Sequence, residues 1–453
     1  MRQADKSMNM ILLTIDCLRA DHLSCLGYSK KTTPNLDDLA STGLLFSQAI
    51  SVGPSTSPSF IAIHTSTYPL MHGGELYISD SRLTLAQALK EHGYHTAAFH
   101  SNPWVSSHYN YNKGFNTFDD GIKQWKAVQK PRALVTQPGW TGRVLTPLAQ
   151  LYKMTMASNI YGNLFSNAQT LNRKAISWLE KNPSNSFLWI HYMDAHEPYL
   201  PIEGAHFLKS YHLTQLDKKA RYFPSPISAN ELNELVNIYD LKISYVDKMI
   251  GSLLKALDKK GILHNTFIII TADHGQQFME HGRYGHHSSH LYDELTRVPL
   301  IIAGPGLTRK AIEQQVSQID LAPTVLDMLN IRKPKAFVGD SLLRTEDKAE
   351  AITEADTGVL QRDIMVTKPK LNVSRRKISV RTGKYKYIYT EAQQDELYDL
   401  ENDPREKQNI LDIQPEVTTE LRAKLTAHME FERSSTRHDE EEWIKRKAKK
   451  LAM

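Results

Sequence analysis

The chain has 453 residues, of which 41% are hydrophobic and 23% are charged, and its formal net charge is +5. These values are typical of a globular protein and exclude a wholly disordered chain, and the length suffices for one large domain or two. The two cysteines, Cys17 and Cys25, form neither a disulfide framework nor a zinc-binding spacing. Because no secretory signal and no apolar run of roughly 18–20 residues is found, we expect a cytoplasmic protein without a transmembrane segment.

Short apolar runs alternate with helix-like segments through the first 300 or so residues. The runs that predict strands are Ile11–Ile15, His95–His100, Phe187–Tyr192, Thr266–Thr271 and Val298–Ala303. The segments that predict helices include Thr33–Leu39, Pro58–Thr65 and Leu83–His92. Strands separated by helices pair in parallel, so we expect an α/β fold with a doubly wound, mostly parallel sheet flanked by helices.

The pattern changes near residue 345, where a smaller C-terminal α+β subdomain is expected. Lys377–Tyr389 alternates like an antiparallel hairpin, and Pro415–Phe431 is helical. We therefore predict a catalytic domain over 1–345, the subdomain over 346–431 and a charged tail over 432–453. Segments 120–167 and 202–226 are predicted to be lids or insertions, and the basic end of the tail suggests weak peripheral contact with an anionic membrane surface.

Polar residues follow several of the predicted strands. Asp16 ends the first strand, and Asp273 with His274 ends the run Phe267–Ile270. The carboxyl ends of parallel strands meet at one edge of a sheet, where ligands bind. Carboxylate oxygens and an imidazole nitrogen suit a divalent cation, whereas capping of the next helix or turn is the plainer alternative for each residue.

A third segment gives a family resemblance. Gly53–Phe60, followed by Thr65–Pro69 and His72-Gly73, resembles the nucleophile segment of the sulfatase family, which belongs to the alkaline phosphatase superfamily. The resemblance extends from about Met10 to Leu411. In that family a Cys that matures to formylglycine lies two residues before the Pro, and an Arg lies two residues after it. Thr56 and Phe60 occupy these positions here, and Thr cannot become formylglycine.

The resemblance implies a metal site. The family has two adjacent Asp ligands for calcium where this chain has Asp16 followed by Cys17, so one ligand is lost and Mn, Mg or Zn is favoured over Ca. The implied ligands are Asp16, Asp273 and His274, with the Thr56 oxygen as the fourth. One metal site is expected rather than two.

Further residues take their expected roles from the same resemblance. His196 falls on the second His of the family's His-x-His-x-Pro loop, which touches the transferred group and can protonate the leaving oxygen. Asp194 replaces the first His, and a second metal bridged by Asp194 and His196 is left open. His287 first, and His286 second, are expected to contact the substrate's phosphoryl oxygens or leaving group, and Asn102 is expected to donate a hydrogen bond to phosphate.

Because the Cys and Arg of the formylglycine segment are replaced, we predict a reaction other than that of a formylglycine sulfatase. We expect a metal-dependent hydrolase or transferase of phosphate or phosphonate esters, acting through a covalent phosphothreonine at Thr56, with hydrolysis favoured over transfer. The alternatives are a sulfuric-ester hydrolase and an inactive metal-binding pseudo-hydrolase. The expected partner is a small or polymeric anionic ester and not a nucleic acid, and the oligomeric state stays open.

Overall fold

A computed structural model describes residues 8–72, 74–121, 167–197, 199, 207–222, 227–287, 289–344, 350–356 and 376–451. The predicted lid over 120–167 lies almost wholly outside these residues. The second predicted lid, 202–226, is described only over 207–222, where it forms helix α7 (Phe207–Tyr222).

A mixed sheet of eight strands forms the centre of the molecule. Its strands, in spatial order, are β10 (Lys310–Ser317), β2 (Leu44–Ile50), β9 (Arg297–Ala303), β6 (Thr266–Ala272), β1 (Asn9–Ile15), β5 (Ser186–Tyr192), β3 (His95–Phe99) and β4 (Thr117–Asp119). All neighbours pair in parallel except β9, which runs antiparallel to both β2 and β6. The central strands β1, β5 and β6 are buried throughout, which explains why each reads as a continuous apolar run.

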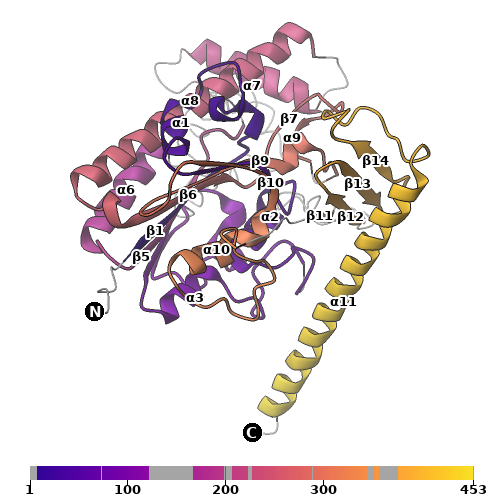
Figure 1. The fold of residues 1–453 in the computed structure, drawn as a ribbon. Coiled ribbons are helices and arrows are strands. Elements are labelled where there is room, and N and C mark those ends of the chain that lie inside the picture. The colour runs from indigo at the N-terminus through magenta and orange to yellow at the C-terminus, as the bar shows by residue number, and fades with distance from the viewer. Residues whose placement is uncertain are drawn as a thin grey trace, which may run out of the picture.

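Helices cover both faces of this sheet (Figure 1). One face carries α1 (Pro34–Ala40), α6 (Ala168–Lys181) and α8 (Ala229–Lys259), and the other carries α2 (Thr56–Thr65), α3 (Leu85–Glu91) and α10 (Leu321–Met328). A hydrophobic core lies between the layers and includes Leu12, Ile190 and Ile269, all essentially inaccessible to solvent. This arrangement confirms the predicted doubly wound α/β fold.

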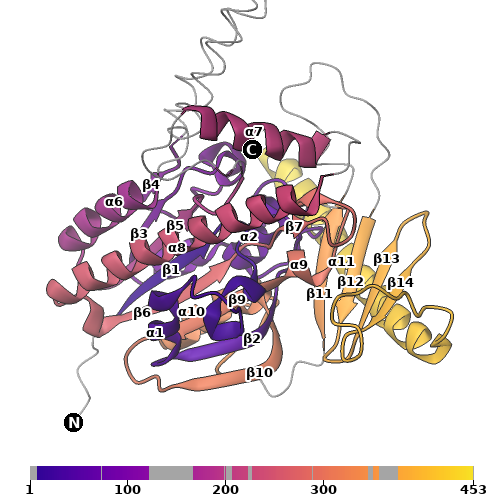
Figure 2. The ribbon, with the colours of Figure 1, turned by 90° about the horizontal axis from the view of Figure 1, so that it is seen from above.

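A smaller antiparallel sheet follows the main one. It contains β11 (Ala351–Asp356), β12 (Arg376–Arg381), β13 (Tyr385–Thr390) and β14 (Glu396–Asp399). Figure 2 shows it to one side of the main sheet, near the short helix α9 (Asp293–Thr296). Helix α11 (Pro415–Leu451) packs on this sheet and continues through residue 431, where the sequence suggested a separate tail. The predicted hairpin is confirmed, and the predicted domain boundaries stay predictions.

Several elements differ from the sequence-based expectation. Strands β2 and β10, the last two at one side of the sheet, were not predicted, because polar residues break the apolar run in each. The strand predicted at Val298–Ala303 exists, but it is antiparallel because β9 follows β6 through the short hairpin of β7 (Gln277–Phe278) and β8 (Tyr284–Gly285) rather than through a crossover helix. Within the described residues, no helix combines the length and apolarity that crossing a membrane requires.

Candidate functional site

Strand register brings three predicted site residues to one edge of the sheet. Ile15, the last residue of β1, pairs with Tyr192 of β5 on one side and with Ala272 of β6 on the other. Asp16 and Asp273 therefore begin the loops at the same level, and the Asp16 amide donates to the Tyr192 carbonyl at 2.9 Å. Both carboxylates are fully buried. The convergence predicted from the strand ends is thus present.

The two carboxylates are only partly matched by hydrogen bonds. Asp16 Oδ2 accepts from Asn102 Nδ2 at 2.9 Å and lies 3.1 Å from His191 Nε2. Asp273 Oδ1 accepts from the backbone amides of His274 and Cys17, at 2.9 and 3.3 Å. Asp273 Oδ2 is buried and has no hydrogen-bond partner among the described residues. A buried carboxylate oxygen without a partner is costly, and a cation would remove that cost.

The pKa values of Asp16 and Asp273 shift in opposite directions. Burial and the nearby Asp16 charge raise the pKa of Asp273 above its usual value. Burial would also raise the pKa of Asp16, but His196 and His191 hold it well below its usual range. Ligand atoms of Asp16, His191 and Asp273 lie within 4.8 Å of one another. The buried acidic cluster formed by these three residues together with His274 therefore fits the divalent cation that the sequence predicts.

Thr56 lies beside this cluster at the start of helix α2. Its Oγ1 is 3.4 Å from His274 Nε2, and the His274 Nδ1 faces the Gly275 carbonyl oxygen at 2.8 Å. The first amides of a helix have no intrahelical acceptors and favour negative charge. An anionic oxygen at Thr56 is therefore stabilised from the helix side, and the predicted role of Thr56 is compatible with its position.

Phe60, where sulfatases have Arg, is packed in an aromatic group instead of facing the cluster. Its ring is 4.8 Å from the His191 ring and 5.1 Å from the Trp189 ring, measured between centroids, and it is fully buried. This packing fixes the rear of the His191 ring and contributes no charge to the site.

A second cluster adjoins the first on the side of the β5 loop. Cys17, His196, Glu197 and His286 have ligand atoms within 4.8 Å of one another. Cys17 Sγ lies 3.0 Å from Asp16 Oδ1, and burial together with the Asp16 charge raises the pKa of the thiol. We call the group formed by Cys17, His196, Glu197 and His286 the thiol–histidine cluster.

The charges of the thiol–histidine cluster are set by close neighbours. Arg221 of α7 forms an ion pair with Glu197 Oε1. Burial would raise the pKa of Glu197, but His196 and Arg221 hold it below its usual value. Burial lowers the pKa of His286 to about 3, so this imidazole is neutral. Burial also lowers the pKa of His196, but Glu197 and Asp16 outweigh it and the net shift is upward.

Other predicted residues lie in less central positions. His287 Nε2 faces the Tyr284 carbonyl oxygen at 3.1 Å, so His286 rather than His287 enters the clusters. Asp194 Oδ2 accepts from the Ala168 amide, the first of α6, at 3.0 Å, and Asp194 belongs to none of the possible metal-ligand groups among the described residues. Asn102 donates a hydrogen bond to Asp16, and the expected hydrogen bond from Asn102 to the substrate stays a prediction.

Sequence reasoning missed three members of the two clusters, Cys17, His191 and Glu197. It also missed Arg221, the ion-pair partner of Glu197. A histidine next to the end of a fully buried strand was an available signal for His191, and Glu197 directly follows a predicted site residue. No sequence signal marks Arg221, because α7 reaches the site only through the tertiary fold.

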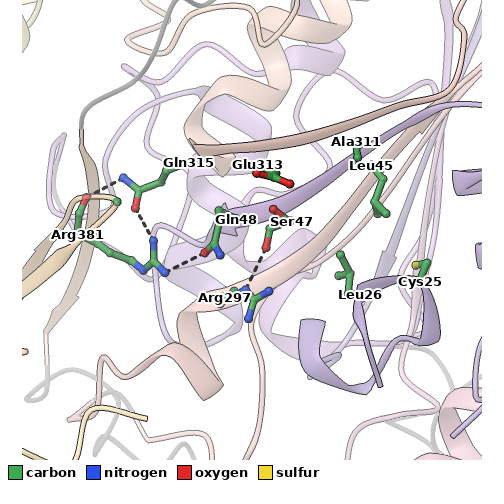
Figure 3. Close-up of a pocket in the computed structure, with 11 residues that line it drawn as sticks. Cys25, Leu26, Leu45, Ser47, Gln48, Arg297, Ala311, Glu313, Gln315 and Arg381 are labelled. Atoms are coloured by element: carbon green, nitrogen blue, oxygen red, sulfur yellow. Dashed lines mark hydrogen bonds between the residues drawn. The ribbon is translucent and has the colours of Figure 1, made fainter. Parts of the chain in front are cut away.

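A separate cavity of about 490 Å³ lies between the β2–β10 edge of the main sheet and the end of β12 (Figure 3). Arg381 spans it, donating to Gln315 Oε1 at 2.6 Å and to Gln48 Oε1 at 2.9 Å, while Arg297 donates to the Ser47 carbonyl oxygen at 3.0 Å. None of the residues that line it belongs to either cluster. The candidate chemistry therefore lies at the buried acidic cluster.

Comparison with known families decides the assignment. The family model described as Sulfatase matches residues 8–331, which covers more than half of the chain. The chain belongs to the sulfatase family. A second model, described as N-sulphoglucosamine sulphohydrolase, C-terminal, matches residues 279–435 of this sulfatase-family chain.

Relatives of this sulfatase-family chain are similar over most of their length. They include the uncharacterized sulfatase YidJ of Escherichia coli K12, which is 24% identical over 90% of this chain and 84% of the relative. Arylsulfatase K of Homo sapiens is 24% identical over 98% and 87%, and the ulvan-active sulfatase of Formosa agariphila is 26% identical over 92% and 80%.

Solved structures share the fold. BT1596, a 2-O GAG sulfatase, aligns with a TM-score of 0.68 and 20% identity over 96% of this chain and 94% of its own. The phosphonate monoester hydrolase of Agrobacterium radiobacter aligns with a TM-score of 0.66 and 21% identity over 95% and 96%. At this identity the likeness establishes the alkaline phosphatase-like fold and not the substrate.

The predicted chemistry on phosphate or phosphonate esters, through a phosphothreonine, is wrong. Both family models and the relatives named above are sulfatases, and they span nearly the whole chain. The prediction rested on what is missing around Thr56 and Phe60. Missing groups remove one route for releasing the transferred group, but they do not select phosphorus over sulfur.

Proposed function

We propose that this sulfatase-family protein hydrolyses sulfate esters and that its substrates are sulfated sugars. The observation that carries the proposal is Thr56 Oγ1, at the family's nucleophile position, 3.4 Å from His274 Nε2 beside the buried acidic cluster. The similarity to an ulvan-active sulfatase, to arylsulfatase K and to the C-terminal part of an N-sulphoglucosamine sulphohydrolase supports the substrate class.

Asp16, Asp273 and His274, with Thr56, are the residues that would hold the divalent cation, which neutralises negative charge and lowers the pKa of a bound hydroxyl. The unpartnered Asp273 Oδ2 supports this assignment. His191 and Asn102 fix the Asp16 carboxylate from behind, at 3.1 and 2.9 Å. Such outer contacts orient a ligand and hold it in one geometry.

The residues support a two-step displacement at sulfur. The Thr56 oxygen, as the deprotonated alkoxide, forms a bond to sulfur while the bond from sulfur to the sugar oxygen breaks, and His196 donates a proton to that leaving oxygen. A water molecule then attacks sulfur, His196 takes one proton from it, and hydrogen sulfate leaves as the Thr56 alkoxide is restored. The raised pKa of His196 suits the donor step.

The test is a substrate panel with ion-chromatographic detection of released sulfate and phosphate. It contains an aryl sulfate, sulfated glucosamine and uronic-acid saccharides, and the matching aryl phosphate, each with Mg²⁺, Mn²⁺, Ca²⁺ or Zn²⁺ added. We expect sulfate release to exceed phosphate release and Thr56→Ala to abolish it. Ser57→Ala is the matched control, because this neighbouring hydroxyl has no assigned role.

Two outcomes would contradict the proposal. Faster turnover of the aryl phosphate than of every sulfate ester would refute the substrate class. Sulfate release that persists at wild-type rate in Thr56→Ala, or that is lost in Ser57→Ala instead, would refute the assignment of the attacking oxygen.

A further inference from the structure

The thiol–histidine cluster contains groups that the proposed sulfate chemistry does not need. The cation that the family implies takes oxygens and His274. Cys17 borders that site, since its thiol also groups with Asp16 and His274, but it groups separately with His196, Glu197 and His286. Cys17 also has a backbone φ of 58°, in the left-handed region that a non-glycine residue rarely adopts. Such backbone strain persists where the surrounding structure holds a residue in place, and it concentrates at functional sites.

We propose that Cys17, Glu197 and His286 form a second metal site that takes Zn²⁺. A thiolate, an imidazole and a carboxylate are the ligand types that bind zinc, and three protein ligands with one open position are typical of zinc that faces a substrate. The metal site requires neither a particular ester nor a particular nucleophile, and in this respect it goes beyond the proposed function.

The sulfur–nitrogen distance within the cluster matches that of a tetrahedral zinc site. With zinc–ligand bonds of about 2.1 Å to nitrogen and about 2.3 Å to sulfur, the two ligand atoms are separated by about 3.6 Å. The distance from His286 Nδ1 to Cys17 Sγ is 3.6 Å, and His286 Nδ1 lies 3.4 Å from Glu197 Oε1, the carboxylate oxygen that Arg221 holds. The ligand atoms of Cys17, Glu197 and His286 all lie within 4.8 Å of one another, so one ion can reach all three.

A buried oxygen without a hydrogen bond provides a second, independent observation. Glu197 is 4% exposed, and its Oε2 has no hydrogen-bond partner among the described residues; His196 Nδ1 lies 3.9 Å from it. Arg221 pairs with the other oxygen and fixes the orientation of the carboxylate. The His286 Nδ1 also lies 3.4 Å from Gln276 Oε1, a distance at the limit of a hydrogen bond, so Gln276 does not compete strongly for this nitrogen.

The charge around the site suits one zinc ion. A Cys17 thiolate and the Glu197 carboxylate carry two negative charges, and Arg221 beside Glu197 carries one positive charge. Asp16, whose Oδ1 lies 3.0 Å from Cys17 Sγ, adds a third negative charge, so a divalent ion would leave the group near neutral. His196, whose ring lies 5.0 Å from the His286 ring, is left out of the proposed zinc ligands and keeps the proton-donor role proposed above.

Metal binding to full-length protein, measured after removal of metal with a chelator, tests the inference. The probes are Zn²⁺ alone, for stoichiometry, and Co²⁺ alone, whose bond to a thiolate gives a charge-transfer absorption. We expect about two equivalents of Zn²⁺ on the wild type and about one on Cys17→Ser. Cys25→Ser is the matched control, since Cys25 is the chain's other cysteine.

The cobalt spectrum identifies the site. The thiolate band should be present in the wild type and in Cys25→Ser, and absent in Cys17→Ser. It should persist in Asp273→Asn, which empties only the first site, and in His196→Asn. His286→Gln replaces Cys17→Ser as the test variant if Cys17→Ser does not fold, and it should also lack the thiolate band.

Absence of the band in wild-type protein, or its persistence in both Cys17→Ser and His286→Gln, would overturn the second site. Failure of sulfate hydrolysis with the band intact would refute the proposed function alone. Sulfate hydrolysis without the band would refute the zinc site alone.

Discussion

The substitution Asp273→Asn should change stability in opposite directions with and without metal. Asp273 is fully buried beside Asp16, and one of its oxygens has no hydrogen-bond partner among the described residues. Asn keeps the size of the side chain and removes its charge. In metal-free protein the substitution removes a repulsion between two buried carboxylates, whereas in metal-loaded protein it removes a ligand.

The magnitude follows from the geometry. Ligand atoms of Asp16 and Asp273 lie within 4.8 Å of each other. At an effective dielectric constant of ~20, two unit charges at that distance repel by about 3.5 kcal/mol. His191 and His274 offset part of this repulsion, so we expect Asp273→Asn to stabilise the metal-free protein by about 1 to 3 kcal/mol.

Metal binding reverses the order. An ion present at about a thousandfold excess over its Kd stabilises the folded wild type by about 4 kcal/mol, and the variant gains nothing from it. For 453 residues, 1 kcal/mol corresponds to about 1 °C in Tm. We therefore expect the variant to melt about 1 to 3 °C above the wild type in chelator, and below it in saturating metal.

The assay is thermal unfolding followed by intrinsic fluorescence, in chelator and then in Mg²⁺, Mn²⁺ or Ca²⁺. Zn²⁺ is omitted because it would also bind the thiol–histidine cluster. The reasoning is refuted if Asp273→Asn melts below the wild type in chelator, or if a metal that raises the Tm of the wild type raises that of the variant equally.

Three further predictions concern ionisable groups. Lys386→Met removes a fully buried ammonium that bonds Asp293 at 2.9 Å, and should cost about 3–5 kcal/mol in the free energy of unfolding by urea, whereas the exposed control Lys384→Met should leave it unchanged. Burial raises the pKa of Glu75 to about 8, so the contribution of this group to the free energy of unfolding is complete below the ordinary Glu pKa and is lost as the pH rises towards 8. Glu75→Gln should therefore flatten the dependence of stability on pH between about pH 5 and pH 8, and an unchanged dependence would contradict this. His196→Asn should slow hydrolysis of alkyl sulfates by about 10²–10⁴-fold while sparing an aryl sulfate with a good leaving group, and equal slowing of both would exclude a proton donor.

Sequence alone determined the parts of the protein that local pattern encodes. The strand runs ending at Ile15, Tyr192 and Thr271 were recognised because a buried parallel strand is apolar throughout. Asp16 and Asp273 followed from these ends, since the carboxyl ends of parallel strands share an edge. The family resemblance also came from contiguous segments, although the residues missing from them led to the wrong ester.

Tertiary structure decided what lies around those ligands. Glu197 and His286 meet Cys17 from two loops that are far from it and from each other in sequence, and Arg221 reaches Glu197 from a helix that no motif marks. The antiparallel direction of β9 likewise depends on a short hairpin and not on the strand's own residues. Periodicity and spacing describe neighbours along the chain, whereas a shared site depends on which loops the sheet register brings to the same level, and that register is fixed only when the whole core packs.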